Sequence, residues 1–256
     1  MSEPIQGAQS FARNIAVLQL IADAGEPLSR ADLQKLCGLT RPTLYRVLAA
    51  LASEGLIELS RDNRYKLGGR LVSLARAALA QNDIRSAAAT PLTRLRDATG
   101  ETVHLAVRSG DELVYVDKIE SREVVRMAST VGTRVPFHSS GVGKAFLSAL
   151  APAEATALIG RLTLLSITPH TTTSRRALLK TVKAAREAGF VRDDQENELG
   201  IVCFGAAIRE AVDRPVASVS VSVPVFRLAH DTAMYSDALL QAVSDISTAL
   251  GMSAIR

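Results

Sequence analysis

Residues 37–57 have the sequence CGLTRPTLYRVLAALASEGLI, and this stretch decides the fold of the N-terminal part of the chain. Its apolar residues recur at the spacing of one helix face: Leu44, Val47, Leu48 and Leu51. Thr40 is a suitable N-cap, and Pro42 is acceptable in a first turn because its missing N–H would have no helical partner there. Gly55 is a typical stop. We therefore predict a helix between Thr40 and Gly55.

Two helices are predicted before this one and a hairpin after it. Residues 10–24 have helical periodicity, with Ser10 as the expected cap, and residues 29–38 are bounded by Ser29 as N-cap and Gly38 as C-terminal stop. Residues 56–68, LIELSRDNRYKLG, contain two β-prone runs around the turn residues Asp62 and Asn63. Three helices followed by a hairpin predict a winged helix-turn-helix in residues 1–67.

The charge of the chain is concentrated in this region. Seven basic and three acidic residues lie between positions 41 and 76, so this segment alone has the net charge of +4 that the whole chain has. The early turns of the third helix and the wing supply the candidate DNA-binding residues: Arg41, Thr43, Tyr45 and Arg46 for the major groove, and Arg61, Arg64 and Lys66 for phosphates. The alternative is a solvated, charged interaction module.

The rest of the chain predicts a helical linker followed by an α+β domain. Residues 68–82 are rich in Ala and Leu and predict the linker helix. Residues 83–256 mix further helices with β-prone runs, as expected for an antiparallel sheet. Expected helices cover 84–100 (with Pro91 near an early turn), 140–150, 152–160, 174–188 and 231–249, and expected strands cover 102–110, 112–120, 123–129, 200–210 and 215–225.

The segment FHSSGVGKAFLSAL, residues 137–150, contains glycines and a lysine and could suggest a phosphate loop. A P-loop requires GxxxxGK followed by Ser or Thr, but Ala145 follows Lys144 and His138 occupies the first glycine position. A nucleotide-hydrolysing loop is therefore excluded. Either the helix N-terminus meets an anion, or Ser139 or Ser140 is a plain cap and the glycines pack against a strand.

Two further stretches have polar residues that could face a ligand. In SVSVSV, residues 218–223, the serines alternate with valines and line either a pocket or a solvated strand face. The acids near Asp193 could hold a metal ion, although acids in a loop are usually solvated and no histidine spacing supports a site, so no metal is expected. Cys203 is expected to be a small buried residue.

The two cysteines, Cys37 and Cys203, are far apart and predict neither a disulfide framework nor a zinc finger. No signal segment and no apolar run of about 18 residues is present, so a cytoplasmic location without a membrane partner is expected.

Together these features resemble the isocitrate-lyase-regulator (IclR) family of bacterial transcription factors. The specific blocks are CGLTRPTLYRVLAALASEGLI, VPFHSSGVGKAFLSAL and DDQENELGIVCFGAAI, followed by the strand of alternating serines. The resemblance covers nearly the whole chain. It implies an N-terminal winged helix-turn-helix and a C-terminal, GAF-like effector domain.

The resemblance also implies the partners and the effector site. Family members act as homodimers or homotetramers on palindromic operators in double-stranded DNA, bind a small organic acid or related metabolite, and need no cofactor. The implied effector-binding residues are Val124, Met127, Gly141, Val142, Asp193, Ile201, Cys203, Ser220 and Ser222. Apolar residues of this pocket vary within the family, so the identity of the ligand does not carry over.

The preferred hypothesis is a ligand-responsive transcriptional regulator without catalytic residues. The alternative is an enzyme fused to a winged helix, with Asp193, Cys203 or a serine as its reactive group. An activated nucleophile needs a base within hydrogen-bond reach, and the sequence has no local pairing of that kind. No GxSxG motif is present.

Overall fold

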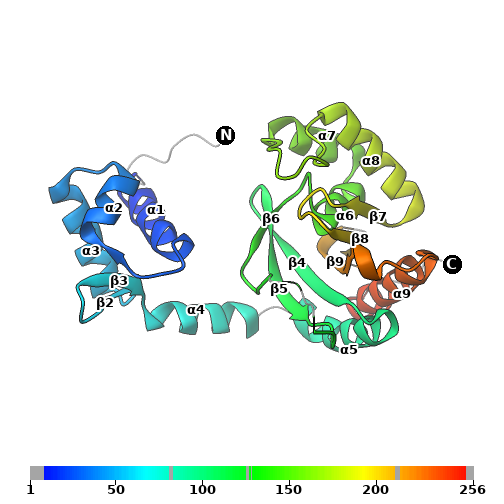
Figure 1. Cartoon of the computed structure of the whole chain (residues 1–256), viewed down its shortest axis with the longest axis horizontal. Helices are drawn as coiled ribbons and strands as arrows, with labels where there is room; N and C mark the ends of the chain where they lie inside the picture. The colour runs from blue at the N-terminus through cyan, green and yellow to red at the C-terminus, as the bar shows by residue number, and fades with distance from the viewer. Residues whose placement is uncertain (1–8, 81–82, 125–126, 128, 211–213, 252–256) are drawn as a thin grey trace. The chain divides into compact units, whose positions relative to one another are not determined.

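The N-terminal unit has the predicted element order, with one additional short strand. The computed structural model describes residues 9–80, 83–124, 127, 129–210 and 214–251, and the chain divides into two compact units, Met1–Gln81 and Asn82–Arg256. The first contains α1 (Gln9–Asp23), β1 (Leu28–Ser29), α2 (Arg30–Cys37), α3 (Arg41–Ser53), β2 (Ile57–Leu59), β3 (Arg64–Leu67) and α4 (Gly69–Ala80) (Figure 1). The strands form an antiparallel sheet in the order β1-β3-β2.

The helix boundaries follow the predicted caps in most cases. Ser29 caps α2 in a reciprocal arrangement with Asp32, and Gly38 ends the helix with a φ of 64°. Thr40 occupies the N-cap position of α3, but its hydroxyl bonds the Thr43 hydroxyl at 2.9 Å instead of a backbone N–H. The prediction for Ser10 was wrong, because α1 already includes Gln9.

A small apolar core holds the N-terminal unit together. Its buried members come from all three first helices and from the sheet: Val17, Ile21, Leu28, Leu33, Leu44, Val47, Leu48, Leu51, Ile57 and Tyr65. The turn of the predicted hairpin is confirmed, since Asn63 adopts a φ of 59° that Asn tolerates. The helix α4 lies within the range expected for the linker helix, whose last two residues, 81 and 82, fall outside the described residues.

The C-terminal unit is a six-stranded antiparallel sheet between two layers of helices (Figure 1). Its elements are α5 (Asp83–Thr99), β4 (Thr102–Ser109), β5 (Glu112–Ile119), β6 (Arg134–Pro136), α6 (Gly141–Ala149), α7 (Pro152–Arg161), α8 (Arg175–Ala188), β7 (Val191–Asp194), β8 (Ile201–Arg209), β9 (Pro215–Pro224), η1 (Val225–Arg227) and α9 (Ala233–Ala249). The strand order is β6-β5-β4-β9-β8-β7. Helices α5 and α9 pack on one side of the sheet, and α6 packs on the other with α8 beside it.

The central strand β9 is buried on both faces. Phe204, whose register partner is Val221, stacks on Tyr235 of α9 with ring centroids 5.2 Å apart. Gly205 pairs with Ser220 and contacts α6 on the opposite face. Ser220 is 2% exposed. The serines therefore face the α6 side of the sheet, and the alternative of a solvated strand face is excluded.

Three further expectations need correction. Pro91 lies in the interior of α5 and not in an early turn. Residues 125, 126 and 128 of the expected strand 123–129 lie outside the described residues, and the described ones belong to no strand. Val124 is 93% exposed. The edge of the sheet beyond β5 is instead occupied by β6, which the sequence analysis did not identify.

None of the helices within the described ranges combines the length and the apolar character needed to cross a lipid bilayer.

Candidate functional site

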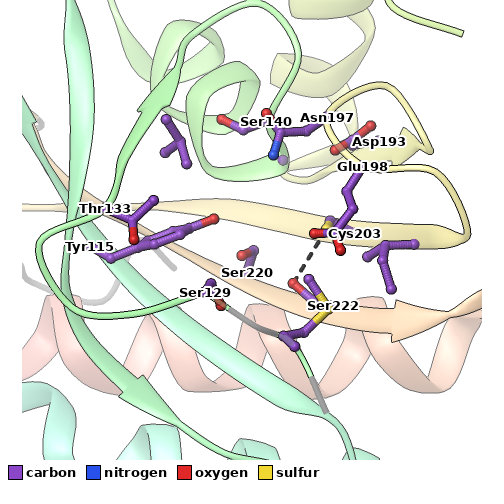
Figure 2. A pocket seen from close by; sticks show the side chains of 14 residues that line it. Tyr115, Ser129, Thr133, Ser140, Asp193, Asn197, Glu198, Cys203, Ser220 and Ser222 are labelled. Atoms are coloured by element: carbon purple, nitrogen blue, oxygen red, sulfur yellow. Dashed lines mark hydrogen bonds between the residues drawn. The ribbon is translucent and has the colours of Figure 1, made fainter. Parts of the chain in front are cut away.

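A partly open cavity of about 160 Å³ lies between the sheet of the C-terminal unit, the N-terminus of α6 and the loop after β7 (Figure 2). Its lining combines hydroxyl, carboxyl, amide and thiol groups with a few apolar side chains: Tyr115, Met127, Ser129, Thr133, Val135, Ser140, Gly141, Asp193, Asn197, Glu198, Ile201, Cys203, Ser220 and Ser222. A cavity of about 150 Å³ accommodates benzene. The space therefore suits a ligand of roughly one small ring or a short chain.

The N-terminus of α6 forms one wall. The Ser140 hydroxyl accepts a hydrogen bond from the Gly143 N–H at 3.1 Å and donates one to the Pro136 carbonyl at 2.7 Å. The N–H groups of Gly141 and Val142, in the first turn, have no acceptor within the helix. They supply donors and the positive end of the helix dipole next to the cavity.

The glycines of this segment also allow α6 to approach the sheet closely. A Cβ atom at Gly205 would lie 2.3 Å from the Gly141 carbonyl oxygen, and one at Gly141 would lie 3.0 Å from the Cys203 Cβ. A Cβ atom at Gly143 would lie 2.6 Å from the Phe137 Cα. Ser140 thus caps the helix, the glycines allow close packing, and the same helix N-terminus lines the cavity, so the two interpretations of this segment are not exclusive.

Lys144 has no phosphate-binding role in this arrangement. Its side chain is completely buried, and Nζ forms a short ion pair with the Glu196 carboxylate and lies 3.9 Å from Asp193 Oδ1. The other Glu196 oxygen accepts from the Thr172 N–H at 2.9 Å. This network connects α6 to the loop after β7, so part of the predicted acidic cluster forms ion pairs inside the protein. Within the described residues, no group of His, Cys, Asp and Glu could hold a metal ion.

Asp193 is the buried carboxyl group of the cavity wall. It is 1% exposed, and its Oδ1 accepts a hydrogen bond from the Glu196 N–H at 2.9 Å. Burial raises the pKa of this carboxyl to about 7, against the opposing effect of the nearby Lys144 ammonium. The group therefore changes its charge near neutral pH.

Opposite α6, a chain of side-chain contacts crosses the floor of the cavity. Ser222 Oγ lies 3.3 Å from Cys203 Sγ and 3.3 Å from His104 Nδ1, and His104 Nε2 lies 2.6 Å from Ser129 Oγ. Burial, assisted by the Lys118 charge, lowers the pKa of His104 to about 3, so the imidazole is neutral at physiological pH. Burial raises the pKa of the Cys203 thiol above its usual range, which keeps it protonated.

Most of the predicted effector residues meet at this cavity. The lining includes Met127, Gly141, Asp193, Ile201, Cys203, Ser220 and Ser222. Val142 instead packs into the core behind α6 and is 1% exposed. Val124 is not among the lining residues: its side chain, 93% exposed, lies in no strand that could turn it toward the cavity.

About half of the lining residues are not predicted from the sequence. Asn197 and Glu198 were within reach, because they fall in the block DDQENELGIV that had been singled out. Tyr115 gave no such signal, since its role depends on the pairing of β4 with β5 and on its ring stacking on His104 at 4.4 Å. Ser129 lies at the end of the expected strand 123–129, whereas Thr133 and Val135 lie in a segment for which no element is predicted.

A second candidate surface lies on the N-terminal unit. Arg41, Tyr45 and Arg46 are exposed on α3, whereas Thr43 is half-buried. On the wing, Arg61, Arg64 and Lys66 are exposed. Lys66 pairs with Glu58 at 3.2 Å, and Arg64 donates to the Pro27 carbonyl at 3.1 Å. The predicted DNA-binding residues thus lie together in this unit, on its third helix and its wing.

Arg30 of α2 also belongs to this surface and was not predicted. Its guanidinium lies over the Tyr45 ring, 5.5 Å from the centroid, and donates to the Tyr65 hydroxyl at 3.3 Å. Arg30, Arg41 and Tyr45 border a shallow hollow between α2 and α3. Arg30 could have been predicted from the sequence, because it directly follows the N-cap Ser29 and is therefore the first residue of the first helix of the helix-turn-helix.

A winged helix-turn-helix unit followed by a cavity-containing antiparallel-sheet unit defines a class of DNA-binding transcriptional regulators. The family model "IclR helix-turn-helix domain" matches residues 10–61, and "Bacterial transcriptional regulator IclR C-terminal" matches residues 76–248. The chain belongs to the IclR family.

Individual relatives agree with this assignment. The HTH-type transcriptional repressor AllR of Escherichia coli K12 is 35% identical over 257 residues, covering 99% of this chain and 95% of the relative. The crystal structure of the Thermotoga maritima IclR is 29% identical with a TM-score of 0.73, over 94% of this chain and 98% of that one. An IclR homologue from Microbacterium hydrocarbonoxydans, crystallised with 4-hydroxybenzoate, shares the fold with a TM-score of 0.79 at 24% identity, over 94% and 99% of the two chains.

Proposed function

We propose that this protein is a ligand-responsive transcriptional regulator that acts in the bacterial cytoplasm. Residues 1–67 bind a palindromic operator in double-stranded DNA, residues 68–82 link the domains, and residues 83–256 bind a small organic acid or related metabolite. Binding of that effector changes operator affinity. The protein works as a homodimer or homotetramer, because a winged helix reads only a few base pairs and a two-fold protein matches a two-fold operator.

The observation that supports effector binding most directly is the cavity at the α6 N-terminus. Ser220 and Ser222 present hydroxyl groups, and the first turn of α6 presents backbone N–H groups. These donors can hold a carboxylate without reacting with it. The homologue crystallised with 4-hydroxybenzoate binds a small aromatic acid, which makes this class of compound a sensible first probe.

The geometry favours a sensor over an enzyme. Ser222 and His104 are within reach of each other, which is the first requirement for an activated serine. However, the second His104 nitrogen contacts Ser129 and not a carboxylate, and the pKa of about 3 makes the imidazole a poor acceptor for a serine proton. We infer that the contacts among these three residues organise the cavity floor.

The test of this function uses the full chain and the double variant Ser220→Ala/Ser222→Ala. An operator fragment is first isolated by selection from genomic DNA, and footprinting should show two half-sites related by a dyad. Aliphatic and aromatic carboxylates, including 4-hydroxybenzoate, are then screened by thermal shift. A bound acid should change operator affinity in the wild type and be recovered unchanged after long incubation.

The double variant should bind the same operator but lose effector affinity, by about 1–3 kcal/mol for each buried hydrogen bond removed. Ser218→Ala is the matched control, because Ser218 lies on the same strand, is fully buried, and is not among the cavity-lining residues. Unaltered effector affinity in the double variant, or conversion of the ligand to a product, would contradict the proposal.

A further inference from the structure

The cavity has an unusual balance of charge for a site that takes an acid. Two carboxyl groups, Asp193 and Glu198, line it, and the lining contains no Lys, Arg or His among the described residues. Glu198 is exposed and retains its contact with solvent. Asp193 is buried. An ionised ligand carboxylate would therefore meet a desolvated negative charge in a space of about 160 Å³.

The cation nearest to Asp193 is already paired with another carboxylate, so it cannot also neutralise the ligand. Lys144 Nζ is bonded to Glu196 and lies 3.9 Å from Asp193 Oδ1. His104, beneath the cavity floor, is uncharged at physiological pH and already contacts two serine hydroxyls. The positive end of α6 offers a partial charge only.

The hydrogen bonds of Asp193 leave one of its oxygens available. Its described contacts, from the Glu196 N–H and the Lys144 ammonium, both involve Oδ1. The described residues provide no hydrogen bond for Oδ2. Figure 2 shows this carboxyl group at the cavity wall, between Asn197 and Glu198. Oδ2 is not among the buried atoms that lack a partner, so it is accessible from the cavity that Asp193 lines. The mostly buried carboxyl group is stabilised by protonation, and a protonated carboxyl is itself a hydrogen-bond donor.

The remaining ionisable groups around Asp193 favour the protonated form. Asp194 and Glu196 are acidic, and the Cys203 thiol and the Tyr115 phenol are neutral. Among the described residues, Lys144 is the positive group that acts on this carboxyl. A bound ligand carboxylate would add a further negative charge. Proton uptake by Asp193 on binding is therefore the expected response.

We propose that the cavity binds a small weak acid together with one proton, which Asp193 holds and donates to one oxygen of the ligand carboxylate. This inference rests on the proposed function, since it concerns the same effector site. The first-turn N–H groups of α6 and the hydroxyls of Ser220 and Ser222 donate to the ligand's remaining acceptors. Asp193 then determines specificity, because its proton selects a ligand that presents a hydrogen-bond acceptor at this wall.

The pH dependence follows from this scheme with a definite sign. Below the pKa of about 7, Asp193 already holds the proton, and affinity for an ionised acid is constant. Above it, the proton must be taken from solvent, so affinity should fall about tenfold for each pH unit. Asp193→Asn places a permanent donor at the same position and retains an oxygen for the Glu196 N–H, so its affinity should not depend on pH.

The experiment is calorimetry on the full chain at pH 6.0 and 8.5, in two buffers that differ in ionisation enthalpy. The probes are two isosteric pairs: propionate with propionamide, and benzoate with benzamide. At least one acid should bind more tightly than its amide at pH 6.0, with affinity reduced more than tenfold at pH 8.5 and about one proton taken up there. Glu187→Gln, a change of an exposed carboxylate on α8, should retain the wild-type pH dependence.

Three results would overturn the proposal. They are pH-independent binding of the acid by the wild type, preference for the amides, and failure of every acid to bind at 10 mM. Operator binding by the same preparation separates this test from that of the proposed function. If DNA binding and its response to another compound persist while acid binding fails, only the proton-sharing scheme is wrong. If acid binds as expected without any effect on DNA, the regulatory function is wrong.

Discussion

Lys144 is the residue whose role differs most from its appearance in the sequence. Next to Gly143 it suggests a phosphate ligand, yet its ammonium is enclosed and paired with Glu196. Removing one partner of a buried ion pair leaves the other charge desolvated, which is far more costly than the pair itself is stabilising. The same ammonium lies close to Asp193, so it also influences the wall of the cavity.

We therefore expect Lys144→Met to lower the free energy of unfolding by about 3–5 kcal/mol in urea denaturation. The double variant Lys144→Met/Glu196→Gln should recover part of this loss, because no unpaired carboxylate remains at that position. Lys180→Met, at an exposed position of α8, is the control and should change stability little. Equal effects of the two single substitutions would show that the buried pair contributes nothing measurable.

At the residue scale, the sequence pattern predicts which residues line the candidate site, but it does not predict the contacts that these residues make. The blocks around Gly141, Asp193 and Ser220 were recognised, and these residues line one cavity. The pairing of Lys144 with Glu196 could not be predicted, because it joins residues 52 positions apart through the fold. Nor could the strand of serines be assigned to a buried face, since the helices that cover it come from other parts of the sequence.

At the scale of elements, the packing of α6 on β8 depends on paired glycines. Gly205 faces the Gly141 carbonyl so closely that a methyl group there would lie 2.3 Å from the oxygen. The backbone, and not a flexible side chain, blocks the space. Gly160, on α7, has no atom within 4 Å of the corresponding position. The two glycines therefore provide opposite environments for the same substitution.

Gly205→Ala should destabilise the protein by about 1–3 kcal/mol, because α6 must move away from the sheet. Gly160→Ala should be neutral or stabilising by up to about 1 kcal/mol, because alanine favours the helix and fills open space. Thermal unfolding followed by circular dichroism distinguishes the two. If Gly205→Ala also weakens ligand binding while the protein remains folded, the position of α6 defines the cavity. A neutral Gly205→Ala would contradict the close approach.

On the helix-turn-helix surface, Arg30 and Arg46 are expected to have different roles in DNA binding. Arg30, held over Tyr45, is placed to contact a DNA phosphate next to the helix that reads the bases. Arg30→Gln should weaken operator and random DNA alike and should reduce the slope of log affinity against log salt by about 1. Arg46→Ala should instead weaken the operator selectively, by about tenfold or more. Fluorescence anisotropy over a salt series measures both effects. Identical behaviour of the two variants would refute this division of roles.

Element boundaries were predicted where a local rule dictates them and were missed where tertiary packing decides. Ser29 and Gly38 bound α2 through cap geometry that involves only neighbouring residues. Pro91 was assigned to an early helical turn because a proline interrupts helical hydrogen bonding, but α5 continues through it while packing against α9. The edge strand β6 has only three residues, too few for an alternating pattern.

At the scale of the whole molecule, the fold class could be predicted from the order of the elements. The effect of a ligand on operator affinity, in contrast, cannot be derived from the structure of either unit alone. A ligand can change operator affinity only if it binds two arrangements of the protein differently. The residues between the DNA-binding and cavity-containing units are largely helical, since α4 extends from Gly69 to Ala80. A helix is stiff over this length, so it can transmit a change in the effector unit to the DNA-binding unit.

The linker prediction follows from that stiffness. A five-residue Gly-rich insertion after Ala77 should abolish the effect of the ligand on operator affinity while leaving operator binding and ligand binding intact when each is measured alone. Ala77→Gly/Ala78→Gly is the matched variant without added length: these exposed positions lose about 1 kcal/mol of helix propensity each, and the coupling should weaken in proportion. Anisotropy titrations with and without the effector give the coupling factor for each protein. If the insertion variant retains the wild-type factor, α4 is a passive tether, and the signal must pass between the units or subunits by direct contact.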